Sequence, residues 1–280
     1  MTKIDVLGIS ETWETKRIIE EINIKGINCQ YIDPRKISYI ISKNEIKCFY
    51  EDKQYTLPDA IILRGGLTRS IKDSGRLFIN YLELKNIKIY DEPVIVWRDL
   101  DKQYQSMKIV SAGLNHPKTF YKIKQKIINE ELKNEIVLKP ILGSKGKGIE
   151  RIDKLNNELD ENYIAQEFRG KIGEDIRVIV VNGEVLGAMK RKSEGSEWRS
   201  NIALGAKGEN IKLTKKLVDT ASKAQKALGM FFSGVDLLEE GNEYVVLEVN
   251  RAPQFKEFES VTKINVAKLL VENVLNELNK

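Results

Sequence analysis

The sequence is poor in the features that mark membrane, secreted and cysteine-metal proteins. No apolar run approaches the ~20 residues that a helix needs to span a bilayer. The first residues, MTKIDVLGIS, lack the layout of a signal peptide and predict a strand instead. The two cysteines, Cys29 and Cys48, have neither metal-ligand spacing nor a disulfide framework. We therefore expect a protein of the reducing cytoplasm that makes no membrane contact.

Two common kinds of active site are also missing. The only histidine, His116, has no evident Ser or Cys partner, so we expect it to pack or to cap a turn rather than to activate a nucleophile. The stretch GISETWET after the first expected strand lacks the glycine spacing of a dinucleotide fingerprint. A Rossmann-like outline in this region therefore does not imply a nicotinamide cofactor.

The charge balance argues against nucleic acid as the main partner. The net charge is +5, but it arises from 46 basic and 41 acidic residues that are mixed along the chain. The densest basic run, KTFYKIKQKI at 118–127, has few aromatic residues. Binding of nucleic acid needs a contiguous basic stripe with interleaved aromatics, which is absent. A basic cleft for an anionic small molecule explains the same excess with fewer assumptions.

The order of expected elements predicts an α/β and α+β protein with three lobes. Strands at 3–9, 28–32, 59–63 and 87–90 and helices at 14–25 and 76–86 predict a small α/β lobe with a mostly parallel sheet. From residue 99 the pattern changes to helices at 101–113, 213–228 and 263–279 and to strands at 135–139, 175–190 and 231–250. We expect lobes at 1–95, 96–180 and 181–280.

The most informative stretch is GVDLLEEGNEYVVLEVN, in which Asp236, Glu248 and Asn250 stand among apolar residues. Glu248 and Asn250 are two apart and share a strand face. A hairpin centred on Asn242 would put Asp236 directly across from Glu248, and facing carboxylates destabilise a strand pair. A divalent cation removes this conflict, and hard oxygen ligands suit magnesium. The alternative is a solvated hairpin with ordinary surface acids.

A second motif predicts a phosphate-binding loop. Lys139 ends a strand and is followed by GSKGKG at 143–148, in which Gly143, Gly146 and Gly148 alternate with Ser144 and two lysines. Backbone N–H groups of such a loop can hold an anion, and the lysines add charge. Because GIERI after the loop predicts a strand, we expect a hairpin tip that folds over phosphates. The alternative is a mobile surface turn.

Further polar residues follow in a fixed order. Glu167 and Phe168 end an apolar strand and could meet an adenine with backbone groups and a ring. Asp175 and Arg177 share a strand face, where Asp175 could bind a ribose or form an exposed ion pair. Arginine forks suit carboxylates and phosphates, and the candidates are Arg191 and the run Arg199-Ser200-Asn201 beside Trp198.

In this order the motifs resemble those of the ATP-grasp superfamily, and specifically its RimK-like carboxylate–amine ligases, the group of glutamate and LysX-type ligases. The resemblance covers about residues 101–268 and continues more loosely through ILRGG at 62–66. The motifs that carry it are DK at 101–102, LKPILGSKGKGI at 138–149, QEF at 166–168, EDIRV at 174–178, EWRSNIALGA at 197–206, GVDLL at 234–238 and LEVNRAPQFKEFESVT at 247–262.

The resemblance implies an ATP-grasp fold with an N-terminal Rossmann-like, pre-ATP-grasp lobe, and it implies roles for the residues above. The loop from Gly143 to Gly148, including Ser144 and Gly146, would cover the phosphates. The expected nucleotide-binding residues are Lys102, Lys139, Glu167, Phe168, Asp175, Arg199, Ser200 and Asn201. Catalysis would fall to Lys139, Arg199 and Asn201, substrate binding to Arg64, Arg191 and Arg199, and magnesium, or manganese in its place, to Asp236, Glu248 and Asn250.

The implied activity is an ATP- and magnesium-dependent ligation through an acyl phosphate. The expected substrates are an amino acid, glutamate first, and a carboxylate acceptor that is a small molecule or a protein C-terminus. Arg251, Gln254 and Lys256 depart from the family pattern and could recognise an acidic acceptor or form a solvated loop. The alternatives are a ligase that activates another small carboxylate and a nucleotide-binding regulatory protein without turnover. A homodimer or homotetramer is expected from relatives of this family.

Overall fold

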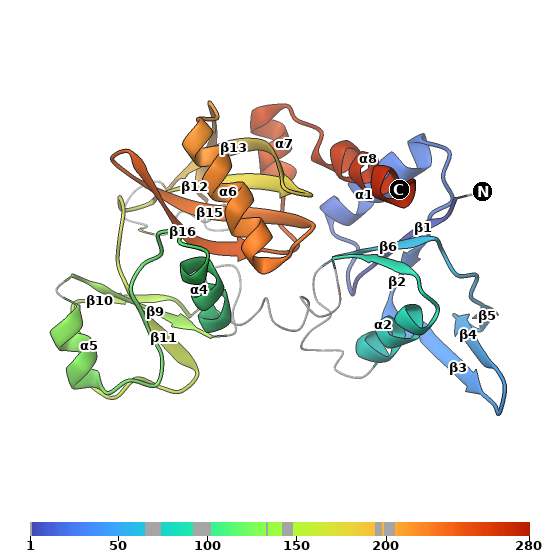
Figure 1. The fold of residues 1–280 in the computed structure, drawn as a ribbon, viewed down its shortest axis with the longest axis horizontal. Helices are drawn as coiled ribbons and strands as arrows, with labels where there is room; N and C mark the ends of the chain where they lie inside the picture. Colours follow the sequence, from blue (N-terminus) through green and yellow to red (C-terminus); the bar gives the residue numbers. More distant parts are fainter. Residues whose placement is uncertain are drawn as a thin grey trace. The chain divides into compact units, whose positions relative to one another are not determined.

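The computed structural model describes residues 2–64, 74–91, 102–132, 134–141, 148–193, 198 and 205–280 (Figure 1). The chain divides into two compact units. The first comprises Met1–Trp97, Gln254–Lys256 and Asn265–Lys280, and the second comprises Arg98–Pro253 and Glu257–Ile264. Within the described residues no helix combines the length and the hydropathy that crossing a bilayer requires.

The first unit is built on a parallel sheet, as its alternating pattern predicts. The strand order is β2-β1-β6-β7, with β2 at Tyr31–Ile32, β1 at Ile4–Leu7, β6 at Ala60–Leu63 and β7 at Lys88–Tyr90. All neighbours run parallel. Every residue of β1 and β6 is buried, which is typical of strands covered on both faces.

Helices of the first unit begin and end close to the expected residues. Helix α1 spans Trp13–Ile24, and the Thr12 side chain caps it by accepting a hydrogen bond from the Thr15 N–H. Gly26 follows with a φ of +69°, the left-handed conformation that ends many helices. Helix α2 spans Ser74–Leu84, two residues earlier than expected at each end.

Two features of the first unit are not among the expected elements. One is the 3₁₀ helix η1 (Pro34–Lys36) with the antiparallel strands β3 (Ile37–Ile41), β4 (Ile46–Tyr50) and β5 (Lys53–Gln54). The other is the position of the last helix, α8 (Val266–Leu278), which packs against α1. Lys25 reaches Glu272 at 2.9 Å, and Arg17 reaches Asn265 at 3.3 Å. The C-terminal helix therefore belongs to the same unit as the N-terminus, because its apolar face is covered there.

The second unit contains a four-stranded antiparallel sheet of order β10-β9-β11-β8. The strands are β8 (Thr119–Phe120), β9 (Ile136–Pro140), β10 (Glu150–Ile152) and β11 (Tyr163–Glu167). Helix α5 (Gln125–Glu131) packs on it through Ile128, which joins Ile136, Leu155 and Ala165 in one buried cluster. The pairing of β9 with β10 confirms a hairpin around the glycine-rich motif. Of that motif, residues 143–147 lie outside the described residues.

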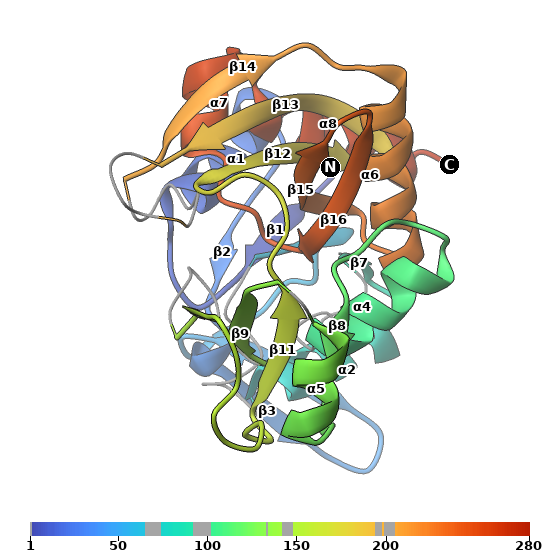
Figure 2. The ribbon, with the colours of Figure 1, turned by 90° about the vertical axis from the view of Figure 1, so that its left-hand side faces the viewer.

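The second sheet of this unit has the order β14-β13-β12-β15-β16. Its strands are β12 (Glu174–Val181), β13 (Glu184–Lys192), β14 (Lys207–Ile211), β15 (Phe232–Glu240) and β16 (Glu243–Asn250). Figure 2 shows α6 (Lys215–Leu228) lying along this sheet, and α4 (Lys102–Ser111) contacts both α6 and β16. The expected lobe boundary at residue 180 falls inside β12.

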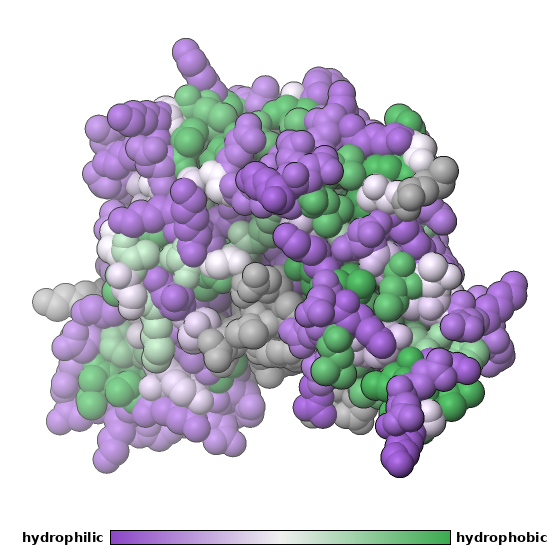
Figure 3. Space-filling model, turned by 45° about the vertical axis from the view of Figure 1, so that its right-hand side comes forward, coloured by the Kyte–Doolittle hydropathy of each residue, from purple (hydrophilic) through white to green (hydrophobic). Residues whose placement is uncertain are grey.

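Close packing against this sheet depends on glycines. Helix α7 (Lys256–Thr262) contributes Phe258, and a Cβ on Gly187 of β13 would come within 3.1 Å of that ring and 2.6 Å of the Ile264 side chain. A side chain at Gly187 would therefore require the Ile264 side chain to move and the Phe258 ring to shift by a few tenths of an ångström. Over the face seen in Figure 3, hydrophilic side chains are interspersed with smaller hydrophobic areas.

Candidate functional site

The β15–β16 hairpin places Asp236 opposite Glu248, as expected, but the pairing results from an irregularity in the strands and not from a turn centred on Asn242. The turn is centred between Gly241 and Asn242, since Glu240 pairs with Glu243 and Leu237 pairs with Val246. This register alone would set Asp236 against Leu247. An irregularity next to Asp236 shifts the register by one residue, so that Glu248 becomes its partner. A bulge of this kind re-aims a side chain at a functional site.

The Asp236 carboxylate is buried and surrounded by cationic and amide groups. The residue is 4% exposed. Arg177, its partner on β12, donates from Nε to Oδ1 and from a terminal nitrogen to Oδ2 at 2.8 Å. A terminal nitrogen of Arg191 lies 3.2 Å from Oδ1. Burial by itself would raise the pKa of Asp236, but Arg177 and Arg191 outweigh it and hold this pKa at about 2.

Asn250 bridges the two facing carboxylates. Its amide Nδ2 lies 3.2 Å from Asp236 Oδ2 and 3.0 Å from Glu248 Oε1. Within the described part of the chain, this is the only hydrogen bond to the Glu248 carboxylate. The three side chains therefore meet at one point of the sheet.

Asp175 and Arg191 form a buried ion pair on the neighbouring strands. They face each other across β12 and β13, and their exposed fractions are 6% and 5%. Arg191 donates from Nε at 2.6 Å and from a terminal nitrogen at 2.5 Å to the two carboxylate oxygens. Burial would lower the pKa of Arg191, but Asp236 and Asp175 outweigh it and raise this pKa. The exposed Asp175–Arg177 pair considered above is wrong, because each residue has a buried partner on another strand.

Lys139 approaches the same carboxylates from the other sheet of the unit. Its ammonium donates a 2.5 Å hydrogen bond to Gln166 Oε1 on β11. Burial lowers the pKa of Lys139 to about 8; Glu248 and Asp236 raise it, and Lys102 lowers it. The Lys139 charge is therefore electrostatically coupled to both acids and to Lys102 at the start of α4. Among the described residues, no ion pair within 4 Å joins Lys139 to either acid.

His116 forms hydrogen bonds to three different elements of the second unit, and the sequence did not predict these bonds. Its Nδ1 lies 2.7 Å from the Val246 carbonyl of β16, and its Nε2 lies 2.9 Å from Ser106 Oγ of α4 and 3.3 Å from Gln166 Nε2 of β11. The expectation of a packing histidine is correct in kind. Only the tertiary contacts show that it connects both sheets.

The expected adenine-binding residues adjoin an aromatic cluster. The Phe168 ring meets Trp198 edge-on at 6.1 Å between centroids. The Arg151 guanidinium lies 5.2 Å from the Phe168 centroid and 5.7 Å from that of Trp198. Glu167 accepts from Asn134 at 3.2 Å. Arg151 was not among the expected residues, because an isolated arginine on a short strand carries no sequence signal.

The remaining expected residues are scattered or undescribed. Arg64 belongs to the first unit, is 5% exposed and lies 5.8 Å from the Phe255 ring centroid. Lys102 begins α4, and Gly148 has a φ of +69° just before β10. Outside the described residues lie Gly143, Ser144, Gly146, Arg199, Ser200 and Asn201.

The donor set at the hairpin fits a hard divalent cation. No group of three or more His, Cys, Asp or Glu side chains is gathered anywhere in the described chain. Here the set is two carboxylates and one amide, which is sufficient for magnesium because that ion keeps several waters and takes phosphate oxygens. Asn250 now presents its N–H groups to the acids. Rotation of this amide would present its oxygen instead.

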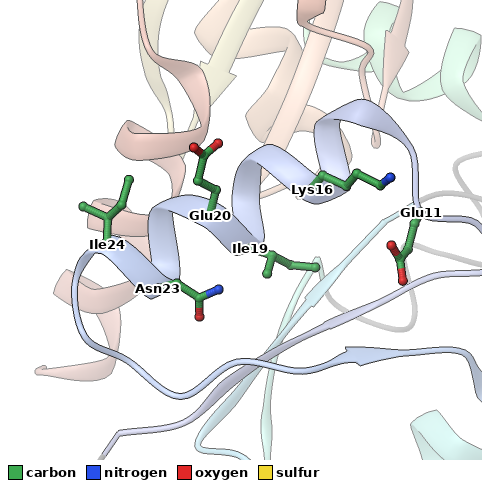
Figure 4. Close-up of a pocket in the computed structure, with 6 residues that line it drawn as sticks. All are labelled: Glu11, Lys16, Ile19, Glu20, Asn23 and Ile24. Atoms are coloured by element: carbon green, nitrogen blue, oxygen red, sulfur yellow. The ribbon is translucent and has the colours of Figure 1, made fainter.

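A surface pocket elsewhere shares none of these residues. It lies along α1 in the first unit (Figure 4), and it is lined by Glu11, Lys16, Ile19, Glu20, Asn23 and Ile24. Its walls come from one helix and from Glu11, which lies two residues before that helix begins. It therefore does not compete with the hairpin as the candidate active site.

Family models match nearly the whole chain. A RimK pre-ATP-grasp domain matches residues 2–94, and a RimK-like ATP-grasp domain matches residues 102–274. Curated relatives include a probable alpha-L-glutamate ligase of Syntrophotalea carbinolica, 30% identical over 95% of this chain and 92% of the relative. Another is the probable alpha-L-glutamate ligase 2 of Pseudoalteromonas atlantica, 30% identical over 98% of this chain and 95% of the relative.

Solved structures share the fold. The ATP-grasp ligase PsnB complexed with a minimal precursor has a TM-score of 0.80 at 19% identity, covering 100% of this chain and 99% of that one. PsnB has also been solved with its precursor, Mg and ADP, with a TM-score of 0.76 at 18% identity over 99% of this chain and 98% of that one. The macrocyclase MdnB of Microcystis aeruginosa has a TM-score of 0.74 at 15% identity and covers 99% of both chains.

The buried ion pairs predict a large cost for Arg191→Met. The substitution leaves the buried carboxylate of Asp175 without its arginine, and removing one partner of a buried pair costs about 3–5 kcal/mol of unfolding free energy. Urea unfolding measures this loss. Lys192→Met is the matched control on the same strand, because the ion pair that Lys192 forms with Glu209 lies at the surface. Equal stability of the two variants would contradict the assignment.

The environment of His116 predicts an unusual titration. Burial lowers its pKa from 6.5 to about 4, the Val246 carbonyl opposes this shift, and Lys139 adds to it. Because the folded pKa lies below the unfolded one, the contribution of this group to stability is complete above pH 6.5 and is lost as the pH falls towards 4.

Nuclear magnetic resonance of the imidazole is a clean measurement here, since the chain has a single histidine. We expect the ring to be half protonated near pH 4. The His116→Phe variant should lose stability less steeply between pH 6.5 and 4. A midpoint near 6.5 would show that the ring is solvated.

Proposed function

The chain belongs to the RimK-like ATP-grasp family and is an ATP-dependent carboxylate–amine ligase, and we propose that it joins glutamate to a carboxylate acceptor through an acyl phosphate. The observation that carries the proposal is the convergence of Asp236, Glu248 and Asn250, whose two carboxylates are electrostatically coupled to Lys139. Two facing carboxylates would be balanced by a bound metal ion, and the buried ammonium of Lys139 would be balanced by the phosphates of a nucleoside triphosphate. In a hairpin with only a structural role, the same charges would cost folding free energy.

The proposed reaction has two steps. A carboxylate is a poor electrophile, so one of its oxygens first attacks the γ-phosphorus of ATP, ADP leaves, and an acyl phosphate forms. The amine of the second substrate then attacks the acyl carbon, inorganic phosphate leaves, and the amine loses a proton as the amide forms. No side-chain nucleophile is needed, which agrees with the absence of a catalytic histidine.

The chain's own residues would orient the reactants. Asp236, Glu248 and Asn250 would hold magnesium, for which manganese can stand in, and the bound ion supplies positive charge to the transferring phosphoryl group. Lys139 and Lys102 would bind phosphate oxygens, and Phe168 and Glu167 would border the adenine. Asp175 is the residue expected to bind the ribose. Both of its carboxylate oxygens accept hydrogen bonds from Arg191, so these bonds would have to break before a ribose could bind.

The substrate assignment rests on the relatives and on arginines. The curated relatives are named as probable alpha-L-glutamate ligases, and solved neighbours include complexes with precursor peptides. A glutamate amine and a peptide or protein carboxylate are therefore the substrate classes that we propose. Arg64 and Arg199 are the candidates for carboxylate binding. Arg191 is bonded to Asp175 and Asp236, so we assign it to setting the charge of the metal residues.

Three further expectations remain part of the proposal. The enzyme would act in the cytoplasm, where ATP and free amino acids are available. A homodimer or homotetramer is the proposed assembly, and the functional lobes are proposed as residues 1–95, 96–180 and 181–280. Size measurement in solution tests the assembly directly.

Glu248→Ala should abolish ADP formation with little loss of folding. The substitution removes one of two carboxylates from the proposed metal set and breaks one hydrogen bond, from Asn250. ADP release and thermal unfolding are measured in parallel. The matched control is Glu243→Ala on the same strand, an exposed acid that should retain wild-type turnover. Normal ADP release by the Glu248 variant would refute the metal assignment.

A substrate screen tests the ligase activity. Purified protein with ATP and magnesium is offered each amino acid with a panel of peptides that end in free carboxylates, and ADP and ligated product are measured. We expect ADP release to require both substrates and to be fastest with glutamate. Product formed with another amino acid in preference to glutamate would overturn the substrate assignment. Nucleotide binding without any product would favour the regulatory alternative.

A further inference from the structure

A series of hydrogen bonds of fixed direction begins at β16 and ends at Lys139. The Val246 carbonyl can only accept, and His116 Nδ1 lies 2.7 Å from it, so Nδ1 carries the proton. In a neutral imidazole the other nitrogen is then an acceptor. His116 Nε2 therefore presents a lone pair to Gln166 Nε2 and to Ser106 Oγ. The single Ser106 hydroxyl proton goes either to Nε2 or to the Lys102 carbonyl, which lies 2.8 Å away.

The Gln166 amide has one favourable orientation. Thr119 donates its hydroxyl proton to the Pro117 carbonyl at 2.8 Å, which leaves Thr119 Oγ1 as an acceptor for Gln166 Nε2, also at 2.8 Å. Two acceptors, on His116 and Thr119, thus face the amide nitrogen. The amide oxygen is turned the other way, towards the Lys139 ammonium at 2.5 Å.

The series links the two sheets of the second unit. Asn115 O accepts from the Val246 N–H at 2.9 Å, and Gln105 Oε1 accepts from the Val249 N–H at 3.1 Å. These contacts fasten α4 and residues 115–116 along the outer edge of β16, the strand that carries Glu248. Gln166 and Lys139 belong to β11 and β9 of the other sheet. Gln166 is 2% exposed, so water cannot readily replace its partners.

We propose that His116 and Gln166 are positioning residues that aim the Lys139 ammonium at the nucleotide phosphates. This inference rests on the proposed function, in which Lys139 binds ATP. If His116 no longer accepts a hydrogen bond, Thr119 Oγ1 alone holds the amide nitrogen of Gln166. The amide then rotates more readily and can turn its N–H groups towards the ammonium. Lys139 would then lose its acceptor and would face the partially positive N–H hydrogens of the Gln166 amide. Because these hydrogens repel the ammonium, the Lys139 side chain would move away from the phosphate position.

A packing role for His116 would have a different consequence. Loss of packing alone lowers stability and affects every ligand that needs the folded unit. A positioning role acts through one amine, so it should disappear when that amine is absent. A double-mutant cycle between His116 and Lys139 separates the two cases.

The test is calorimetric titration of the full chain with a non-hydrolysable ATP analogue in the presence of magnesium. The variants are His116→Phe, Gln166→Leu, Lys139→Met and the His116→Phe/Lys139→Met pair. Since a hydrogen bond to a charged group is involved, we expect His116→Phe and Gln166→Leu each to weaken binding by about tenfold. In the Lys139→Met background, His116→Phe should weaken it by less than about twofold.

Two further variants serve as a control and as a substitute for His116→Phe. Gln225→Leu is the matched control, because Gln225 is a buried amide whose hydrogen bonds, among the described residues, go to backbone groups of Val180, Gly183 and Phe231 and not to Lys139. It should leave the affinity unchanged whatever it does to stability. If His116→Phe does not fold, Thr119→Val removes the other acceptor at constant shape and should weaken binding about threefold or more.

The possible results are distinguishable. Wild-type affinity in the Gln166 and His116 variants, or an equal effect of His116→Phe with and without Lys139, would overturn the positioning role while the ligase assignment stands. Failure of the wild-type protein to bind the analogue would overturn the proposed function itself. A loss confined to the Lys139-containing background supports the inference.

Discussion

A buried carboxylate that must be balanced by cations determines the arrangement of the second unit. Asp236 is 4% exposed, and an uncompensated charge at this depth would cost several kcal/mol. Arg177 and Arg191 supply the compensation from two neighbouring strands, and Arg191 in turn requires Asp175. The Arg177–Asp236 pair thus favours one register of β12 against β15, because a slip by one residue would set each of these charges against an apolar side chain.

The same arrangement leaves room for function at the outer strand. Glu248 is opposite Asp236 only because the hairpin is irregular at that point, and it is held by Asn250 alone among the described residues. The carboxylates of Asp236 and Glu248 therefore lie close together, but the arginines that balance Asp236 do not balance Glu248. A cation bound there would complete the balance, and the Lys139 ammonium contributes from the facing sheet.

His116 connects the two sheets in a way that makes the lysine part of the hairpin site. The edge of β16 is covered by Gln105, Asn115 and His116 rather than by another strand. A covered edge is protected from unwanted pairing, and here the cover also carries the hydrogen bonds that lead to Gln166. Stability of the sheet edge and orientation of Lys139 are thus linked through one side chain.

Local patterns in the sequence determined much of this protein. Alternating apolar runs and helical spacing predicted the parallel sheet of the first unit, and Asp236, Glu248, Asn250 and Lys139 could be singled out because polar residues interrupt apolar strands. Motif order predicted the family. These features are local, since strand and helix periods and short spacings are written within a few residues.

Tertiary structure decided the partners. The choice of Arg191 rather than Arg177 for Asp175, the irregularity that brings Glu248 opposite Asp236, the packing of α8 against α1 and the bridge through His116 all join residues far apart in the chain. Each depends on which strand lies beside which and on how deeply a charge is buried. A side chain's partner is set by burial and strand order in space, neither of which a short stretch of sequence contains.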